Sequence, residues 1–341
     1  MIVLRPARES DFTTIATMAL ESLIGVTTLP KDPILLERRL LHSCESFSAH
    51  PLRAGNELYL FVAEDLKHHE VIGISGIEAT TGQDGPLYFF KRERYDTDSI
   101  LEKVPKSIPI LTPVSYLHGS SEVCSLFVTP RWRRCGVGTL LSIARFLFVA
   151  AHKHLFTASI YTELRGVIED GRSPFWEGIG SKFFSATFEE AHDLFKYGKT
   201  FITEFLPKYP IYIDLLPQEV QNVIGKTHEE TAKAQKILIS QGFQTTALID
   251  IFDGGPKLEV LQENVDAIRS SRLMPVEEII KEIEPKVEAL VSNERFDFRC
   301  CSSPIIVGKH GITIDKATAE ALEISLSDNV RIYIEGKHAL D

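Results

Sequence analysis

The chain runs Ser121-Glu-Val-Cys-Ser-Leu-Phe-Val-Thr-Pro130 and continues as Arg131-Trp-Arg-Arg-Cys-Gly-Val-Gly-Thr-Leu-Leu141. The first segment has the apolar character of a buried strand, and the second is a turn that opens a helix. Because Gly136 and Gly138 lack a β-carbon, this turn can adopt strained dihedral angles and let a pyrophosphate approach the main chain. The free amides of the new helix would point at that anion. The segment therefore predicts an anion-binding turn between a strand and a helix.

Charge and spacing narrow the kind of turn. Arg133 and Arg134 add positive charge at the same place. A Rossmann turn requires three glycines as G-x-G-x-x-G, and a P-loop requires G-K-[ST] after four spacer residues. The third glycine of the first motif and the lysine of the second are both missing here. The alternative that the turn alone leaves open is an ordinary strand-to-helix connection whose arginines are merely solvated.

The flanking segments give this turn a context. Residues 2–12 read as a short strand, a proline stop and the start of a helix, and residues 58–63 and 71–77 read as a β-hairpin. After the turn, apolar residues keep helical spacing over 140–150, and residues 158–165 form a further strand. The order is therefore a strand, a helix, a hairpin, the strand with its turn, a helix and a strand.

This order, together with the spacing Arg133-x-x-Gly136-x-Gly138 after the strand, resembles the GNAT superfamily of acyl-CoA N-acyltransferases over about the first 190 residues. The resemblance implies an α+β fold with a mixed sheet flanked by helices. It also implies that the strand bearing Leu126 and Val128 splays from its neighbour, so that its free main-chain groups bind pantetheine and polarise the thioester carbonyl. The implied acyl-CoA-binding residues are Leu126, Val128, Arg133, Arg134, Gly136, Val137 and Gly138.

Longer segments give a closer resemblance, to the arginine N-succinyltransferase family, over nearly the whole chain. They are His118-Gly-Ser-Ser-Glu-Val-Cys-Ser-Leu126, Glu163-Leu-Arg-Gly-Val-Ile168, Ser173-Pro-Phe-Trp176, Val223-Ile-Gly-Lys-Thr-His228 and Ile249-Asp-Ile-Phe-Asp-Gly-Gly-Pro256. The chain departs from the family in the less glycine-rich loop 23–29 and in the carboxy-terminal tail. If that loop lines the acceptor pocket, the departure bears on which amine is accepted.

The family resemblance implies transfer of succinyl from succinyl-CoA to the α-amine of L-arginine. The amine is mostly protonated near neutral pH, so a base must remove a proton before the nitrogen attacks the thioester. The resemblance carries the proton-donor role toward the CoA thiolate onto His228, whereas a lone histidine at a helix start is otherwise a cap or surface residue. Glu122 is the candidate base and Glu163 the runner-up, with a surface or cap role open for Glu122. The reaction needs no cofactor, since succinyl-CoA is a substrate.

Substrate selection requires charged side chains of both signs. A cation must read the terminal carboxylate of succinyl, and buried carboxylates must read the guanidinium of arginine. Arg165 and Arg172 are the candidates for the first role, and Asp250 and Asp253 for the second.

Composition excludes several other classes of protein. The 341 residues carry a formal charge of −10, which argues against a nucleic-acid partner, and no apolar run is long enough to span a membrane. The beginning of the chain lacks a signal-peptide core, which predicts a cytoplasmic location. The five cysteines form no C-x-x-C pair, so neither a metal site nor a redox motif is expected. Cys135 lies in the turn, but a nucleophilic role lacks a defined histidine partner.

Three regions are expected along the chain. Residues 1–194 would form the acyl-CoA-binding domain, residues 195–272 a second, partial GNAT-like lobe that completes the active site, and residues 273–341 a connector helix and a small β-barrel-like domain. The charged segment 273–285 is the expected helix.

Two alternative functions and one assembly remain open. The chain could use ornithine, another amine or another acyl-CoA, or it could be a non-catalytic sensor that binds acyl-CoA. The family resemblance also raises the expectation of a homo-oligomer.

Overall fold

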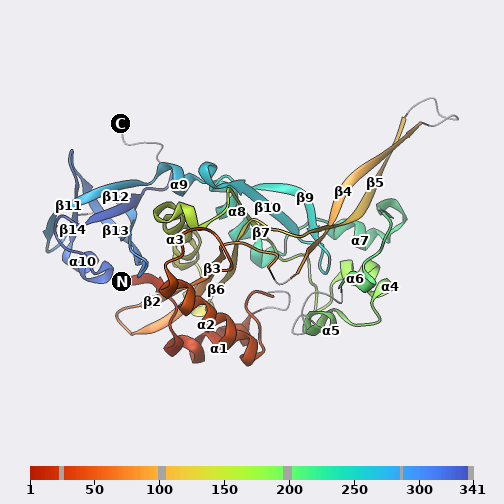
Figure 1. Cartoon of the computed structure of the whole chain (residues 1–341), viewed down its shortest axis with the longest axis horizontal. Coiled ribbons are helices and arrows are strands. Elements are labelled where there is room, and N and C mark those ends of the chain that lie inside the picture. Colours follow the sequence, from red (N-terminus) through yellow and green to blue (C-terminus); the bar gives the residue numbers. More distant parts are fainter. Residues whose placement is uncertain (23–26, 84, 99–104, 195–201, 285–286, 337–341) are drawn as a thin grey trace.

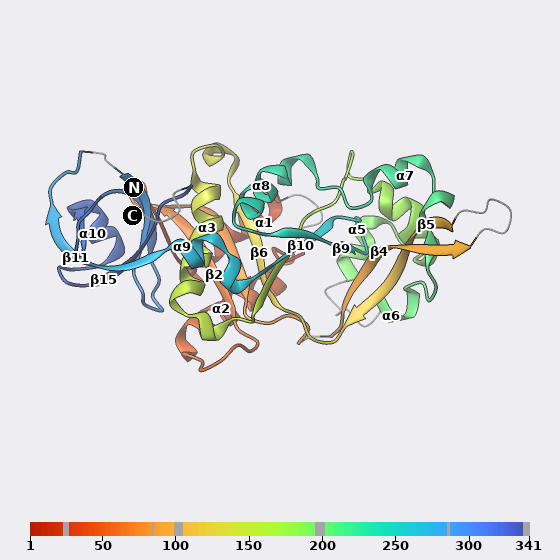
Figure 2. The same cartoon turned by 90° about the horizontal axis from the view of Figure 1, so that it is seen from above.

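The computed structural model describes the whole chain except residues 23–26, 84, 99–104, 195–201, 285–286 and 337–341. The described residues form a 15-stranded sheet in the order β12-β15-β11-β14-β13-β1-β2-β3-β6-β7-β10-β9-β4-β5-β8. Figures 1 and 2 show an elongated molecule with the C-terminal strands at one end and the β4–β5 hairpin at the other. The expected mixed sheet flanked by helices is confirmed.

The strands of the central part are β1 (Ile2–Pro6), β2 (Leu58–Asp65), β3 (Glu70–Glu78), β4 (Leu87–Asp98), β5 (Pro105–Tyr116), β6 (Ser121–Val128), β7 (Ser159–Glu163), β8 (Ile211–Tyr212), β9 (Gln244–Asp250) and β10 (Pro256–Leu261). The helices are α1 (Phe12–Glu21), α2 (Pro33–Ala49), α3 (Val137–Ala151), α4 (Ser181–Phe183), α5 (Phe188–Asp193), α6 (Ile202–Phe205), α7 (Gln218–Val223), α8 (Ala232–Ser240), α9 (Asp266–Ser270) and α10 (Lys316–Leu322). Within these described residues no helix is long and apolar enough to cross a membrane.

Strand β2 is apolar at every position from Leu58 to Ala63, because both of its faces are covered. Successive side chains of a strand point to opposite faces, so a strand covered on both faces needs apolar residues at every position. Tyr59, Phe61 and Ala63 belong to the core that contains α3, and Leu58, Leu60 and Val62 to the core that contains α1 and α2. Two helical layers therefore cover this part of the sheet.

Helix α3 connects β6 to β7, which pair in parallel, as a strand-helix-strand crossover requires. Its apolar side chains are buried almost continuously, from Val137 to Ala150. This close packing depends on Gly73 in β3, because a β-carbon there would lie 2.7 Å from Leu141 Cδ1 and 2.9 Å from the carbonyl oxygen of Phe127. The crossover fixes the start of α3 against the end of β6.

Strands β9 and β10 belong to the same sheet as the amino-terminal strands. Strand β10 pairs with β7, and β9 pairs with the long hairpin β4–β5. Neither this hairpin nor α2 was predicted from the sequence. The predicted domain boundaries stay predictions, and the first of them falls at residues 195–201, outside the described part of the chain.

The carboxy-terminal strands are β11 (Arg272–Ile280), β12 (Val287–Ser292), β13 (Cys300–Val307), β14 (Ile312–Asp315) and β15 (Asn329–Tyr333). Their order β12-β15-β11-β14-β13 closes on itself because β12 also pairs with β13. The expected β-rich region is thus confirmed. Strand β13 continues into the central sheet by pairing with β1, and Phe298 packs on Phe148 of α3 at 5.4 Å between ring centroids.

The expected helix over residues 273–285 is wrong, because residues 272–280 form strand β11 and residues 281–284 form no helix; residue 285 lies outside the described part of the chain. The first half of β11 pairs with β15 and its second half with β14, so both edges of the strand are used. Pro275 would break the interior of a helix, and Val276, Ile279 and Ile280 favour a strand. The glutamates and lysine that suggested a helix have only a weak intrinsic preference, which pairing with two strands overrides.

Candidate active site

Strands β6 and β7 separate soon after they meet. Their parallel pairing is confined to Ser121 with Ile160 and Glu122 with Tyr161. On its other edge β6 follows β3 to Val128, but with one extra residue between the pairs Ile74–Phe127 and Gly76–Cys124. Such an extra residue is a β-bulge, which bends a strand and increases its twist. The structure thus contains the splay implied by the sequence, with Leu126 and Val128 beyond the point of divergence.

The bulge is held by side chains from two other segments. Ser125 has a φ of 54°, which a residue with a β-carbon rarely adopts, and its amide donates to Thr28 Oγ1 at 3.1 Å. From below, the fully buried Arg145 of α3 donates from Nη1 to the carbonyl oxygens of Gly76 at 2.9 Å and Cys124 at 3.1 Å. Burial lowers the pKa of this guanidinium to about 10. Arg145 was not predicted, although a lone arginine within an apolar helix is a readable signal.

A cavity of about 1320 Å³ opens where β6 and β7 diverge. Of the residues singled out from the sequence, those that line it are Glu122, Leu126, Val128, Arg133, Arg134, Gly138, Glu163, Arg165, Asp250 and Asp253. Gly136, Val137 and His228 lie beside the lining rather than in it, and Arg172 lies elsewhere. Residues far apart in the sequence therefore meet at one place.

The predicted anion turn forms at the mouth of this cavity. Arg134 and Gly136 have φ values of 68° and 84°, and the carbonyl of Gly136 accepts hydrogen bonds from the amides of Thr139 and Leu140, each at 3.0 Å. The amides of the first helical residues, Val137 and Gly138, have no acceptor within a helix. Arg133 and Arg134 are exposed beside them. The turn thus combines free amides, the positive end of α3 and two exposed cations, which suits a phosphate group.

Glu122 lies at the point where the strands diverge. The hydroxyl of Tyr161 in β7 donates to Glu122 Oε2 at 3.1 Å. Burial, followed by the charge of Glu122, raises the pKa of Tyr161 well above its ordinary value, so the phenol keeps its proton. Across the sheet Glu122 faces Glu78, which forms an ion pair with Arg39 at 2.9 Å. A carboxylate is thus held at the apex of the cavity by a group that can only donate.

His228 caps the 3-10 turn Glu229–Thr231. Its Nδ1 accepts a hydrogen bond from the amide of Glu230 at 3.2 Å, and its own amide donates to the carbonyl of Arg165 at 2.9 Å. A neutral imidazole whose Nδ1 accepts must carry its hydrogen on Nε2. The structure therefore shows the capping role that the sequence left open, and this role leaves Nε2 as the nitrogen able to donate.

The two aspartates hold their own turn. Asp253 is buried, and its two oxygens accept from the amides of Gly166 and Gly255, each at 2.8 Å. Burial and, after it, the nearby Asp250 raise the pKa of Asp253 to about 8. Asp250 Oδ1 accepts from the amides of Phe252 and Asp253. Both residues line the cavity, but their carboxylate oxygens also accept hydrogen bonds from main-chain amides.

Arg165 and Arg172, the two candidates for a carboxylate, differ in position. Arg172 is exposed and forms two hydrogen bonds to Glu177, at 2.6 and 2.7 Å. Arg165 lines the cavity, and its Nε and Nη1 atoms are buried without a hydrogen-bond partner. No group of three or more metal-ligating side chains is found among the residues described.

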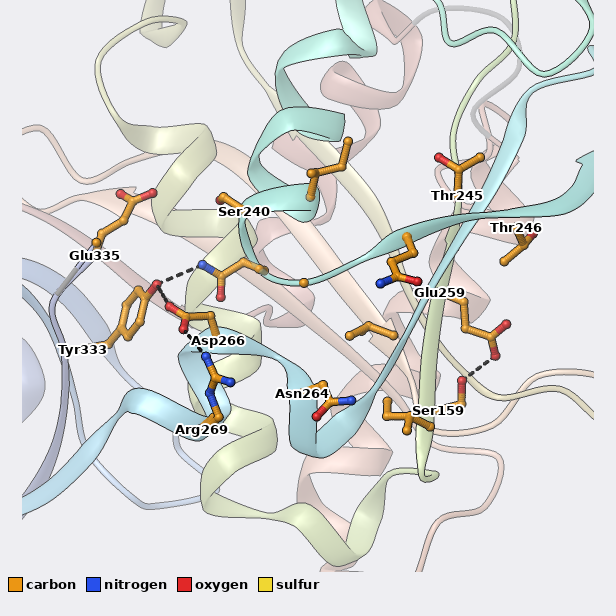
Figure 3. A pocket seen from close by; sticks show the side chains of 17 residues that line it. Ser159, Ser240, Thr245, Thr246, Glu259, Asn264, Asp266, Arg269, Tyr333 and Glu335 are labelled. Atoms are coloured by element: carbon orange, nitrogen blue, oxygen red, sulfur yellow. Dashed lines mark hydrogen bonds and ion pairs between the residues drawn. The ribbon is translucent and has the colours of Figure 1, made fainter. Parts of the chain in front are cut away.

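A second, more open cavity of about 950 Å³ lies beside the carboxy-terminal barrel (Figure 3). Its polar side chains satisfy one another: Tyr333 donates to Asp266 at 2.8 Å, Gln241 donates to Tyr333 at 3.0 Å, and Arg269 pairs with Asp266 at 3.3 Å. None of the residues singled out from the sequence lines it. The larger cavity is therefore the candidate active site.

Comparison with known proteins gives consistent matches along the chain. A family model described as arginine N-succinyltransferase beta subunit matches residues 2–269, and one for the C-terminal domain of that subunit matches residues 272–333. The arginine N-succinyltransferase of Photorhabdus laumondii is 36% identical over 97% of this chain and 98% of its own. That of Yersinia enterocolitica is 37% identical over 97% of each. The solved arginine/ornithine succinyltransferase subunit AI of Pseudomonas aeruginosa superposes with a TM-score of 0.90, at 32% identity, over 99% of both chains.

Two glycine variants of the anion turn separate the effect of backbone conformation from the effect of the space that a β-carbon occupies. Gly136→Ala forces a β-carbon onto a φ of 84°, which costs about 1 kcal/mol of stability and weakens CoA binding about tenfold. Gly138→Ala places its β-carbon 3.8 Å from Val128 Cγ2, an ordinary contact, on the cavity side. We expect it to keep the stability of the parent and to weaken CoA binding by obstructing the phosphate. Urea denaturation and calorimetric CoA titration measure both; equal loss of stability in the two variants would contradict this reading.

Proposed function

The chain belongs to the arginine N-succinyltransferase family, and on that premise we propose that it transfers succinyl from succinyl-CoA to the α-amine of L-arginine, giving N2-succinyl-L-arginine and CoA. The observation that carries the assignment of the site is the divergence of β6 from β7 beside the anion turn. It gives one cavity a place for phosphate, a strand edge for pantetheine and a carboxylate at the apex. The enzyme is an acyl-CoA-dependent N-acyltransferase.

In the proposed reaction the anion turn at Gly136 and Gly138 receives the CoA pyrophosphate, assisted by Arg133 and Arg134. The pantetheine arm follows the edge of β6 that β7 leaves free, past Val128 toward Leu126. Main-chain groups at the bulge then polarise the thioester carbonyl. Such preorganised donors stabilise the oxyanion that develops when the amine attacks.

Proton transfers complete the reaction. Glu122 removes a proton from the α-ammonium group of arginine, and the free amine attacks the carbonyl carbon. The nitrogen, positively charged after the attack, loses its second proton to solvent, the bond between carbon and sulfur breaks, and the electron pair leaves with the CoA thiolate. When the ring is protonated, Nε2 of His228 can donate a proton to neutralise the thiolate, and Nδ1, which then also carries hydrogen, no longer accepts from the Glu230 amide. Because the amine attacks directly, neither a covalent enzyme intermediate nor a bound cofactor is needed.

The same proposal covers location and assembly. All five cysteines are free thiols, which supports a reducing, cytoplasmic location. The net charge of −10 supports small-molecule substrates rather than nucleic acid as partners. The matching family model and the solved relative are both described as subunits, which supports assembly into an oligomer, and we propose a homo-oligomer. Sedimentation analysis of the purified protein would test the last point.

The function is tested by measuring CoA release from succinyl-CoA or acetyl-CoA with L-arginine, L-ornithine or agmatine as acceptor. We expect turnover with succinyl-CoA and L-arginine. Agmatine keeps the corresponding primary amine but lacks the α-carboxylate, so its use as an acceptor tests which end of arginine is read. Preferential use of ornithine would reassign the acceptor, and CoA binding without turnover of any amine would support a non-catalytic sensor instead.

His228 can be separated into its two roles by a pair of variants. His228→Asn keeps a side chain that caps well and accepts from the Glu230 amide, but it cannot supply a proton. His228→Ala removes both functions. We expect kcat to fall by about 10²–10⁴ in both, because a positioned acid contributes that much. Full activity of His228→Asn, with only the alanine variant impaired, would show that the cap alone matters.

Glu122 should show its role in the pH dependence. Glu122→Gln keeps an acceptor for the Tyr161 hydroxyl but no longer takes a proton. We expect kcat/KM to fall by about 10²–10⁴ at neutral pH. The loss should shrink as the pH rises past the pKa of the α-amine, about 8 or somewhat higher, because the substrate then arrives deprotonated. Glu163→Gln, from the same cavity, is the matched control. A deficit that stays constant with pH would argue against Glu122 as the base.

A further inference from the structure

Arg165 stands on a rigid part of the backbone, just beyond the end of β7. The amide of the preceding Leu164 donates to the carbonyl of Pro256 at 3.0 Å, and the amide of the following Gly166 donates to Asp253 Oδ2 at 2.8 Å. The carbonyl of Arg165 itself accepts from the amide of His228. A β-carbon at Gly166 would lie 2.2 Å from the carbonyl oxygen of Asp253, so the two segments are in direct contact. Three hydrogen bonds therefore fix the direction from which the Arg165 side chain starts.

Within the described part of the chain, no carboxylate forms an ion pair with the guanidinium at the end of this half-buried side chain. Its Nε and Nη1 atoms are buried, and neither has a hydrogen-bond partner among the described residues. Asp253 and Glu230 are the carboxylates whose charges act on it, and burial lowers its pKa. Among the interactions of the described residues Asp253 forms no ion pair with Arg165; its oxygens accept from the amides of Gly166 and Gly255, and burial raises its pKa to about 8. A buried cation with unused donors is costly unless an anion from outside completes it.

The other cations that line the cavity are differently placed. Arg39 is paired with Glu78, and Arg145 is committed to the carbonyls that hold the bulge. The remaining lining cations are exposed: Lys31, Arg38, Arg133, Arg134 and Lys233. Arg165 thus combines burial, a fixed backbone and free donors within the described lining of this cavity.

The position of Arg165 within the site indicates which anionic group of the substrates it binds. The phosphates of CoA belong to the turn at Gly136, which the pantetheine arm separates from the thioester. Arg165 instead is bonded through its carbonyl to His228, the residue assigned to the departing sulfur. The terminal carboxylate of succinyl lies only two methylene groups beyond the thioester carbonyl. A planar guanidinium can bind both oxygens of such a carboxylate.

We propose that Arg165 binds the terminal carboxylate of the succinyl group and thereby selects succinyl-CoA over acetyl-CoA. This inference rests on the proposed function, since it names the donor-reading residue of the same site. Acetyl-CoA lacks this carboxylate, so its binding would leave the donors of the guanidinium without a partner. A site with such unpaired polar groups rejects the smaller analogue strongly. Arg165 acts by binding and orienting the donor, and no bond to it is made or broken.

The test compares the affinity of each donor in the absence of an amine. Dissociation constants of succinyl-CoA, acetyl-CoA and CoA are measured by calorimetry for the parent, Arg165→Gln and Arg165→Lys. We expect Arg165→Gln to weaken succinyl-CoA binding by about 100-fold and to leave acetyl-CoA and CoA within about threefold. Arg165→Lys keeps the charge without the planar fork and should recover part of the loss. Arg172→Gln, an exposed arginine paired with Glu177, is the matched control and should match the parent.

Turnover measurements separate this inference from the proposed function. Absence of turnover by the parent with succinyl-CoA and L-arginine would overturn the function, whereas the binding ratios test Arg165 directly. Equal weakening of both acyl donors in Arg165→Gln, or an unchanged ratio, would overturn the inference while the function stands. A variant that loses its preference for L-arginine over agmatine but keeps its preference for succinyl-CoA would show that Arg165 reads the acceptor's carboxylate instead, which also overturns it.

Discussion

The loss of pairing between β6 and β7 beyond Glu122 is the constraint on which the rest of the site depends. Two parallel strands that continued side by side would use each other's main-chain groups and leave no cavity. The extra residue near Ser125 bends β6 instead, so that its edge and a space of about 1320 Å³ become available to a ligand. The positive φ of Ser125 is unfavourable by itself, and the hydrogen bonds of Thr28 and Arg145 offset that cost.

Two arginines that line this cavity, the buried Arg145 and the half-buried Arg165, differ in whether their donors find partners within the protein. Arg145 donates to main-chain carbonyls of the protein itself, and these hydrogen bonds stabilise the shape of β6. The backbone of Arg165 is fixed by hydrogen bonds, whereas its buried Nε and Nη1 donors have no partner in the described residues. A bound anion would supply that partner. A protein tolerates the second arrangement where ligand binding returns the free energy that burial costs.

His228 has a capping role in the structure and a proposed chemical role as the proton donor. The hydrogen bond from the Glu230 amide decides which ring nitrogen carries hydrogen, and it also ties the ring to the first turn before α8. Through its own amide His228 is bonded to Arg165, so the residues assigned to the sulfur and to the succinyl carboxylate share one piece of backbone. The second cavity, by contrast, has side chains that pair with one another.

Local patterns were enough to predict the hairpin β2–β3, the strand β6, the glycine turn and helix α3, because each depends on neighbours in the chain. The family segments carried the predicted roles of Leu126 and His228; Leu126 and Glu122 line the cavity, and His228 lies beside it. The strand nature of residues 272–280 could not be read in the same way, since pairing with β14 and β15 overrides a weak helical preference. Nor could the sequence choose between Arg165 and Arg172: both are cations near β7, and only the folded chain buries one without a partner and pairs the other with Glu177 at the surface.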